Sequence, residues 1–417
     1  MSDSGSNELN IALVTLSGLV MVLGLLSGLL KERLFLSEPM VALLAGVLLG
    51  PSVLGLLNLA DWGKPEIILE QGSRLAIAMQ VMGVALQLPK GYIRRNCRSL
   101  AVLLGLAMPL MWLSSGLLAY LILGLPFWEG MLIGAIVTPT DPILSSSVVT
   151  GQVAEQNLPA NIRHTLSAES GANDGLAYLL VLLPILLLTQ APGEALVHWF
   201  TKTLLWEVIG ALPLGALMGY AAGRTLLWAE IKQTTEKQSF LAYTIALALA
   251  TLGAVKLLGS DGILAVFVAG VTFDLVVSGG ERAEESGVQE AIDRFFTLYV
   301  FVLLGLALPW EKWLKLGWNG LLLAVAVLLL RRIPAVLALK PLVPRLRGMQ
   351  DALLIGWFGP IGVAALYYAV LSQRRTGIEA TWVVGSLLIC ASIFAHGITA
   401  VPLAKLYGNR VQSTKNR

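Results

Sequence analysis

Long apolar runs separated by short polar loops make up most of this chain. A helix that crosses the roughly 30 Å hydrocarbon core of a bilayer needs about 20 apolar residues. Counting runs of that length predicts about thirteen membrane-spanning helices, and therefore an all-α membrane protein. The runs fall near residues 11–30, 39–58, 66–88, 99–122, 127–149, 163–189, 203–224, 238–258, 262–279, 291–309, 316–338, 351–371 and 381–405.

The composition supports this class and excludes others. Of 417 residues, 56% are hydrophobic and 13% are charged, whereas soluble domains carry roughly 25% charged residues. The net charge of +3 is small and scattered, so we expect no nucleic-acid partner. The two cysteines, Cys97 and Cys390, lie in unrelated contexts without metal-ligand spacing. We expect no cofactor.

The loops indicate how the chain is oriented. Lys and Arg concentrate in loops on the cytoplasmic side of membrane proteins. The amino-terminal residues 1–10 are acidic and polar, so residues 11–30 read as a retained helix and not as a signal peptide. With the amino terminus outside and the carboxyl terminus in the cytoplasm, one side collects most of the basic loop residues. We therefore expect a multi-pass protein of the cell membrane in this orientation.

The positions of helix-breaking residues suggest an internal repeat. Transporters are commonly built from inverted repeats with corresponding Gly/Pro-interrupted helices. The fifth predicted span contains Pro139 and Pro142, and the twelfth contains Gly359 and Pro360. The sequence thus predicts one membrane domain, residues 1–417, with two inverted six-helix repeats and broken helices in spans 5 and 12. Its parts are repeat 1 (11–189), a linking span (203–224), repeat 2 (238–405) and a short cytoplasmic tail (406–417).

The first acidic string lies at the break in span five. Pro139 and Pro142 lack a backbone N–H and disfavour helix at the residues before them, so the chain around Thr140 and Asp141 should be unwound. Unwound backbone at membrane depth occurs where it is buried in protein or lines a wet cavity, and its free carbonyls suit a cation. The alternative is a kinked helix that ends in a surface loop and leaves Asp141 in water.

The second acidic string lies on span six. Glu169 and Asn173 are four residues apart and share a helical face, while Asp174 is turned about 100° from Asn173. The alternative is a polar loop over residues 161–175. Placed against the break in span five, this string supplies hard oxygen ligands, which suit an alkali cation better than a transition metal. The predicted cation and proton ligands are Asp174, Asp141, Thr140 and Ser170, with Asp174 and Asp141 as the charged ones.

One carboxylate can serve both a proton and a metal ion. Burial favours its protonated form and a nearby cation favours its ionised form, so the two ligands compete. Because Asn173 stands where a second acid could stand, we expect one proton to exchange for one monovalent cation, without net charge movement.

A buried Glu169 requires a positive partner. Arg331 and Arg332 interrupt the apolar run 321–339 and have no acid on the same helix at i±3 or i±4. We expect one of them to pair with Glu169. Alternatively, both lie at a cytoplasmic helix end and extend to water.

Several of these strings together resemble a known family. The chain is similar to monovalent cation/proton antiporters of the bacterial NhaP-like branch, which is related to eukaryotic sodium/proton exchangers and to fungal alkali-cation antiporters. The resemblance covers essentially the whole chain. Its most specific parts are Thr140-Asp141 before Pro142, Glu169-Ser170 with Asn173-Asp174, Gly262 to Gly270, Gly356-Trp357-Phe358-Gly359-Pro360 and His396-Gly397-Ile398-Thr399.

The resemblance implies more than the residues show alone. It implies a homodimer in which a six-helix core with crossed, broken helices moves against a dimerisation domain. It makes Asp174 the ion- and proton-binding carboxylate, completed by Asp141, Thr140 and Ser170. It makes Asn173 and Glu169 organising residues, with Arg331 preferred over Arg332 as the partner of Glu169. Many relatives have an arginine where this chain has Ile361, so a role for that arginine does not transfer.

The predicted function is therefore exchange of a monovalent cation, Na⁺ before K⁺ or Li⁺, for H⁺. A passive cation channel could use the same acids and carbonyls, but the chain lacks a repeated filter sequence. An intramembrane aspartyl protease could use Asp141 and Asp174, but it gives Asn173 and Glu169 no role. We expect a transporter and not an enzyme.

Overall fold

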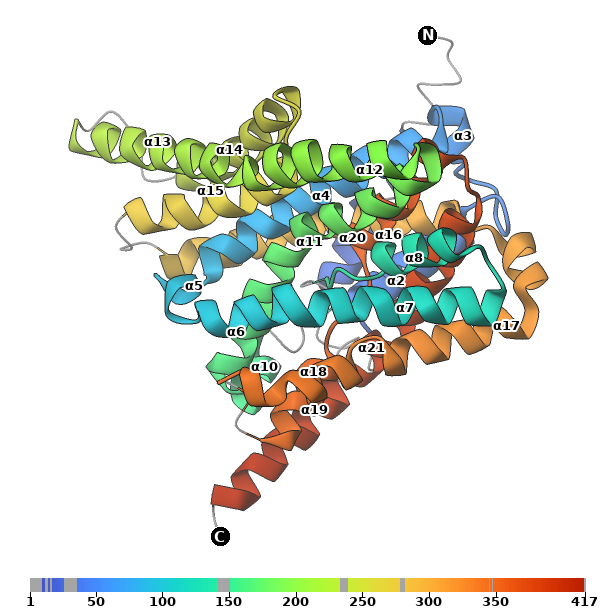
Figure 1. Cartoon of the computed structure of the whole chain (residues 1–417). Helices are drawn as coiled ribbons and strands as arrows, with labels where there is room; N and C mark the ends of the chain where they lie inside the picture. Colours follow the sequence, from blue (N-terminus) through green and yellow to red (C-terminus); the bar gives the residue numbers. More distant parts are fainter. Residues whose placement is uncertain are drawn as a thin grey trace.

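The chain folds into a bundle of long helices (Figure 1). The structure is a computed structural model, and it describes residues 10–11, 14–15, 17–25, 36–141, 144, 151–232, 239–277, 282–344, 346 and 348–415. No strand occurs in these ranges, so the predicted all-α class is confirmed. Parts of the predicted first and fifth spans, residues 26–30 and 145–149, lie outside the described residues, as does Pro142.

The helices follow the chain in a simple order. Three segments, η1, η2 and η3, have π or 3-10 geometry, and the others are α-helical. The elements are α2 (Glu38–Leu49), α3 (Leu59–Trp62), α4 (Pro65–Gln87), α5 (Tyr92–Arg95), α6 (Cys97–Val102), η1 (Leu103–Ala107), α7 (Met108–Leu123), α8 (Phe127–Ile136), α10 (Gly151–Asn157), α11 (Ala160–Thr189), α12 (Pro192–His198), η2 (Trp199–Ile209), α13 (Ala211–Ile231), α14 (Ser239–Leu257), α15 (Gly262–Val276), α16 (Arg282–Leu306), α17 (Trp310–Leu330), α18 (Ile333–Leu339), η3 (Lys340–Leu342), α19 (Met349–Trp357), α20 (Val363–Thr376) and α21 (Ala380–Lys415).

Five helical stretches in the described part of the chain are long and apolar enough to cross a membrane. Shorter apolar helices of 10–17 residues accompany them, at 38–49, 127–136, 241–257 and 262–276. The number thirteen for the spans stays a prediction that is consistent with this pattern. The five stretches are Cys97–Leu123, Ala160–Thr189, Pro192–Ile231, Trp310–Leu342 and Ala380–Arg410.

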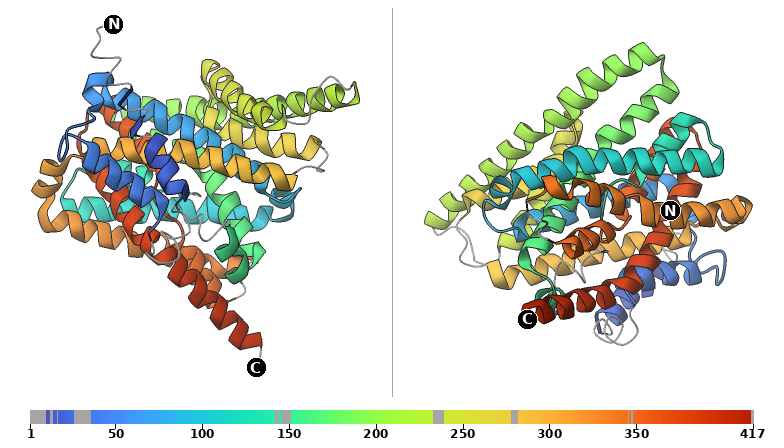
Figure 2. Two further views of the ribbon diagram at one scale, coloured as in Figure 1. Left: turned by 180° about the vertical axis from the view of Figure 1, so that it is seen from behind. Right: turned by 60° about the horizontal axis from the view of Figure 1, so that its bottom comes forward.

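Helix α11 runs through the centre of the bundle (Figure 1). It packs against α4, α8, α15, α20 and η2. Helix α4 also contacts α15, α16 and α20. Figure 2 shows the carboxyl-terminal helix α21 projecting beyond the rest of the bundle. The polar string of span six therefore lies on a continuous, central helix and not in a loop.

The predicted breaks in spans five and twelve are present, and one other predicted span, 316–338, is wrong as a continuous helix. Helix α8 ends at Ile136, and the described residues that follow it, up to Asp141, are not helical. The predicted span 316–338 breaks at Arg331 and Arg332, between α17 and α18. The span 351–371 breaks between Trp357 and Val363, where Pro360 cannot donate a helical hydrogen bond. In addition, the predicted span 39–58 is helical only over α2.

Helices α13 and α15 approach each other closely along a row of glycines. A Cβ atom on Gly215 would lie 2.3 Å from the carbonyl oxygen of Ala265, and one on Gly219 would lie 2.2 Å from that of Ala269. Both positions are buried. Small residues at such positions let helix backbones come together in a membrane.

The variant Gly219→Ala should therefore destabilise the protein. The new methyl group would force α13 away from α15, a cost of roughly 1–3 kcal/mol for overpacking. Thermal unfolding of the detergent-solubilised protein should show a lower midpoint. Gly253→Ala is the matched control, because a Cβ atom at Gly253 would meet nothing within 4 Å. Equal midpoints for the two variants would contradict this packing.

Candidate functional site

The two non-helical segments after α8 and α19 contact each other. The backbone N–H of Asp141 donates to the carbonyl of Pro360 at 2.9 Å. The Asp141 carboxylate accepts hydrogen bonds from the backbone N–H of Leu144 at 3.1 Å and from that of Val363, the first residue of α20, at 2.8 Å. Asp141 thus stabilises the amino-terminal end of a helix that carries a partial positive charge.

The close approach of these segments depends on glycine. A Cβ atom at Gly362 would lie 2.2 Å from Oδ2 of Asp141, and one at Gly359 would lie 2.4 Å from Cδ of Arg332. Any larger residue would push a charged side chain out of its place. The Gly-Pro string that predicted the break therefore also makes room for the two charged groups.

A hydrogen-bond network holds Thr140 against α11. The Asn173 side chain accepts a hydrogen bond from the backbone N–H of Thr140 at 3.1 Å and donates one to its hydroxyl at 2.9 Å. The Thr140 and Ser170 hydroxyls lie 2.9 Å apart and share a hydrogen bond. All three side chains are buried. Asn173 therefore satisfies the backbone that the helix break leaves without a helical partner.

Asp174 is the most unusual side chain of the group. It is 1% exposed, and neither carboxylate oxygen has a hydrogen-bond partner among the described residues. It also experiences the electrostatic repulsion of Asp141. Its backbone carbonyl accepts a hydrogen bond from the Tyr368 hydroxyl at 2.6 Å. A buried carboxylate without a partner is costly, so Asp174 needs a proton or a cation.

Glu169 forms a buried ion pair with Arg332. Nη1 and Nη2 of the arginine lie 2.6 and 2.7 Å from the two carboxylate oxygens, and both side chains are 2% exposed. The arginine Nε also donates to the carbonyl of Ile355 at 2.9 Å. This two-point pairing is the strong geometry for an arginine and a carboxylate. It fixes α11 against the break between α17 and α18.

The preference for Arg331 as the partner of Glu169 is wrong. Arg331 keeps helical backbone angles at the end of α17 and Arg332 directly precedes α18, and adjacent residues point in different directions. The guanidinium of Arg331 donates to the carbonyls of Val137 and Gly359, which lie at the ends of α8 and α19. These carbonyls carry partial negative charge, and Arg331 neutralises both helix ends at once.

Two residues of α21 support the break in span twelve: the sequence singled out His396 only as part of the family resemblance, and it did not indicate Ser392. Ser392 accepts a hydrogen bond from the backbone N–H of Ile361 at 2.7 Å. His396 contacts the Ser392 hydroxyl at 3.1 Å and the carbonyl of Trp357 at 2.9 Å. Their spacing of four residues on α21 places them on one face, but only the fold shows that this face meets the break.

The charges of the site are therefore unequally neutralised. Glu169 has Arg332, Asp141 has backbone N–H groups, and Arg331 has carbonyl oxygens. Among these charged groups, Asp174 alone has no partner in the described part of the chain. The arrangement can hold one small cation or one proton at a carboxylate beside two helix breaks. The hydroxyl of Thr140, in the non-helical segment after α8, lies 2.9 Å from the hydroxyl of Ser170 on α11. Within the described ranges we find no group of three or more His, Cys, Asp and Glu residues that could hold a resident metal.

Comparison with known proteins agrees with this arrangement. Residues 18–406 match the family model described as "Sodium/hydrogen exchanger, transmembrane". The chain belongs to the sodium/hydrogen exchanger family. As a member of this family it is an integral multi-pass membrane protein.

Individual relatives show how far the similarity extends. The chain is 34% identical to Na(+)/H(+) antiporter 2 of Zygosaccharomyces rouxii over an alignment of 437 residues. This alignment covers 95% of this chain and 54% of that protein. It is 35% identical over 369 residues to the Na(+)/H(+) antiporter of Saccharomyces cerevisiae, covering 87% of this chain and 37% of that protein. This exchanger family member thus spans about half, or less, of the length of these two relatives.

A solved structure has the same fold. The structure of the sodium proton antiporter MjNhaP1 from Methanocaldococcus jannaschii superposes with a TM-score of 0.75 at 20% identity, and the match covers 97% of this chain and 99% of that one. The predicted antiporter fold is therefore confirmed for this exchanger family member.

Proposed function

We propose that the protein exchanges a monovalent alkali cation, Na⁺ first, for H⁺ by alternating access, with both ions competing for Asp174. The observation that carries this proposal is the buried Asp174 carboxylate, whose two oxygens have no partner beside two broken helices. Membership of the exchanger family and the names of the fungal relatives support it.

The remaining site residues have separate roles in this proposal. Asp141, Thr140 and Ser170 complete the ion site, while Asn173 and the Glu169–Arg332 pair keep its helices in place. Arg331 holds the two helix ends together. No cofactor and no catalytic residue is needed, because the one bond that forms and breaks in this exchange is the O–H bond of the protonated carboxyl group.

The stoichiometry follows from the charges. The site offers one unneutralised carboxylate, and the neighbouring Asn173 is a neutral amide engaged with Thr140. Loading one proton or one monovalent cation therefore leaves the same total charge, so turnover should be electroneutral with one ion exchanged for one proton.

The setting in the cell follows from the loops and the family. We infer a homodimer in the plasma membrane, with the amino terminus outside and the carboxyl terminus in the cytoplasm. The basic loop residues support the orientation.

A cation series in reconstituted vesicles tests the function. With a preformed pH gradient and the membrane voltage clamped by a K⁺ ionophore, external Na⁺ should dissipate the gradient at an unchanged rate at every clamped voltage. Li⁺ is tested under the same voltage clamp, and K⁺ is tested in vesicles without the ionophore. Cation flux that follows voltage and moves no protons would instead indicate a channel.

A further inference from the structure

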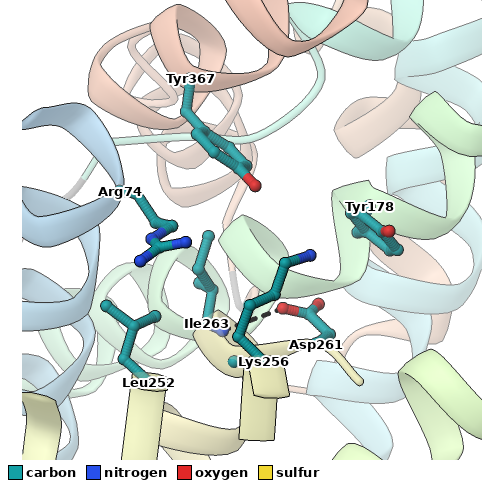
Figure 3. Close-up of a pocket in the computed structure, with 8 residues that line it drawn as sticks. Arg74, Tyr178, Leu252, Lys256, Asp261, Ile263 and Tyr367 are labelled. Carbon is teal, nitrogen blue, oxygen red and sulfur yellow. Dashed lines mark hydrogen bonds between the residues drawn. The ribbon is translucent and has the colours of Figure 1, made fainter. Parts of the chain in front are cut away.

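A narrow cavity lies between α4, α11, α14, α15 and α20. Its lining includes Arg74, Tyr178, Lys256, Asp261 and Tyr367, and it has room for about one water molecule. Figure 3 shows these side chains arranged around a common open space. The lining residues thus come from α4 and from four helices that pack against it.

Asp261 has one carboxylate oxygen in use and one without a partner. Oδ1 accepts hydrogen bonds from the backbone N–H groups of Ile263 at 2.9 Å and Leu264 at 3.3 Å, and so begins α15. Oδ2 has no hydrogen-bond partner in the described residues, although the side chain is only 6% exposed. An ionised group in this position gains free energy from any positive ligand.

The cavity lies close to Asp174 along α11. Tyr178 is four residues beyond Asp174, so both side chains lie on the same face about one helical turn apart. On α20, Tyr367 precedes Tyr368, whose hydroxyl bonds the Asp174 carbonyl at 2.6 Å. The cavity is therefore about one helical turn from Asp174, towards the carboxyl end of α11.

Two cationic side chains share the cavity but do not pair with Asp261. The structure records no ion pair between Asp261 and Arg74 or Lys256 in the described residues. The ammonium group of the exposed Lys256 lies 5.9 Å from the ring centre of Tyr178, a cation–π contact. The positive charges of Arg74 and Lys256 lower the local concentration of cations in the cavity. A site on a transport route must bind weakly enough to release its ion.

We propose that Asp261 forms a second, weaker site for the transported monovalent cation, on the route between Asp174 and the membrane face where α14 ends. Oδ2 is the charged ligand, and the hydroxyls of Tyr178 and Tyr367 border the same space. Hard oxygen groups of this kind suit alkali cations. The inference rests on the proposed exchange and adds a second cation position to it.

The test measures the apparent KM for Na⁺ separately from each membrane face. Everted and right-side-out vesicles from the same cells expose opposite faces. For Asp261→Asn, the remaining oxygen still accepts from the start of α15, while the charge at Oδ2 is lost. The apparent KM should rise about tenfold when Na⁺ is supplied at the Lys256 face and stay near the wild-type value at the other face. An equal change at both faces, or none, would overturn the second site.

Lys256→Gln separates a cation site from an internal ion-pair gate. If Asp261 binds Na⁺, removing the nearby positive charge should lower the apparent KM at the Lys256 face several-fold. If Lys256 is instead the moving partner of Asp261, this variant would reproduce the defect of Asp261→Asn, and the proposal fails.

Asp351→Asn is the control. The Asp351 carboxylate also accepts a backbone hydrogen bond at the start of a helix, from the N–H of Gly348 at 3.1 Å, but it lies away from the cavity. Wild-type protein without exchange at either face would refute the proposed function itself.

Discussion

Replacing Asp174 with asparagine should abolish cation-dependent proton movement. The amide keeps the shape of the side chain, but it can neither bind a proton in the working range nor neutralise an alkali cation. Since both oxygens of Asp174 are buried without a partner, the substitution removes a group that contributes function and not stability. Vesicles containing the variant should retain a preformed pH gradient when Na⁺, Li⁺ or K⁺ is added.

The same variant should fold at least as well as the wild type. A neutral amide at this position no longer carries the cost of a buried, unneutralised charge beside Asp141. Thermal unfolding should show an unchanged or higher midpoint. Asp61→Asn, at an exposed acid on α3, is the control that should exchange normally. Exchange by Asp174→Asn at the rate of this control would mean that the ion site lies elsewhere.

The helix breaks were predictable because proline and glycine act locally. Pro139 and Pro360 cannot donate a helical hydrogen bond, and with Pro142 and Gly359 beside them they located both breaks, whereas the isolated Pro184 and Pro402 lie inside the continuous helices α11 and α21. The contact between the two breaks is a tertiary feature. Asp141 contacts the start of α20, and Gly362 leaves room for its carboxylate. This contact joins two segments that are more than two hundred residues apart in the sequence.

The partner of Glu169 shows why the site could be predicted only in part. The pattern of charges in an apolar run identified Arg331 and Arg332 as a pair of candidates. Deciding between them required the positions of the neighbouring helices. Adjacent residues point in different directions, and the packing of α11, α8 and α19 around this break brings Arg332 to Glu169 and Arg331 to carbonyl oxygens.

Asp261 was overlooked for a related reason. Its position before an apolar helix is typical of a helix-capping residue, and it does cap α15. Capping uses one carboxylate oxygen, however, and sequence does not show whether the other is in water or buried. The fold buries the second oxygen in a cavity that Tyr178 of α11 and Tyr367 of α20 also line. The sequence does not show that these two helices lie beside α15.

Removing one member of the Glu169–Arg332 pair should cost more stability than any other single change considered for this protein. Arg332→Gln leaves Glu169 buried and charged without a partner, and Glu169→Gln does the same to Arg332. Breaking a buried ion pair in this way costs roughly 3–5 kcal/mol. We expect low yields of folded protein and a strongly reduced thermal midpoint for both single variants.

The double variant Glu169→Gln with Arg332→Gln distinguishes pairing from general disruption. With neither charge present, no unpaired ion remains buried, so the double variant should be more stable than each single variant. A double-mutant cycle then gives the coupling between the two side chains. The exposed pair Lys312–Glu379, with side chains 46% and 58% exposed, is the control, because pairs in water contribute about 0–1 kcal/mol. Single losses no greater than those of Lys312→Gln, or additive losses in the double variant, would show that Glu169 and Arg332 do not stabilise each other.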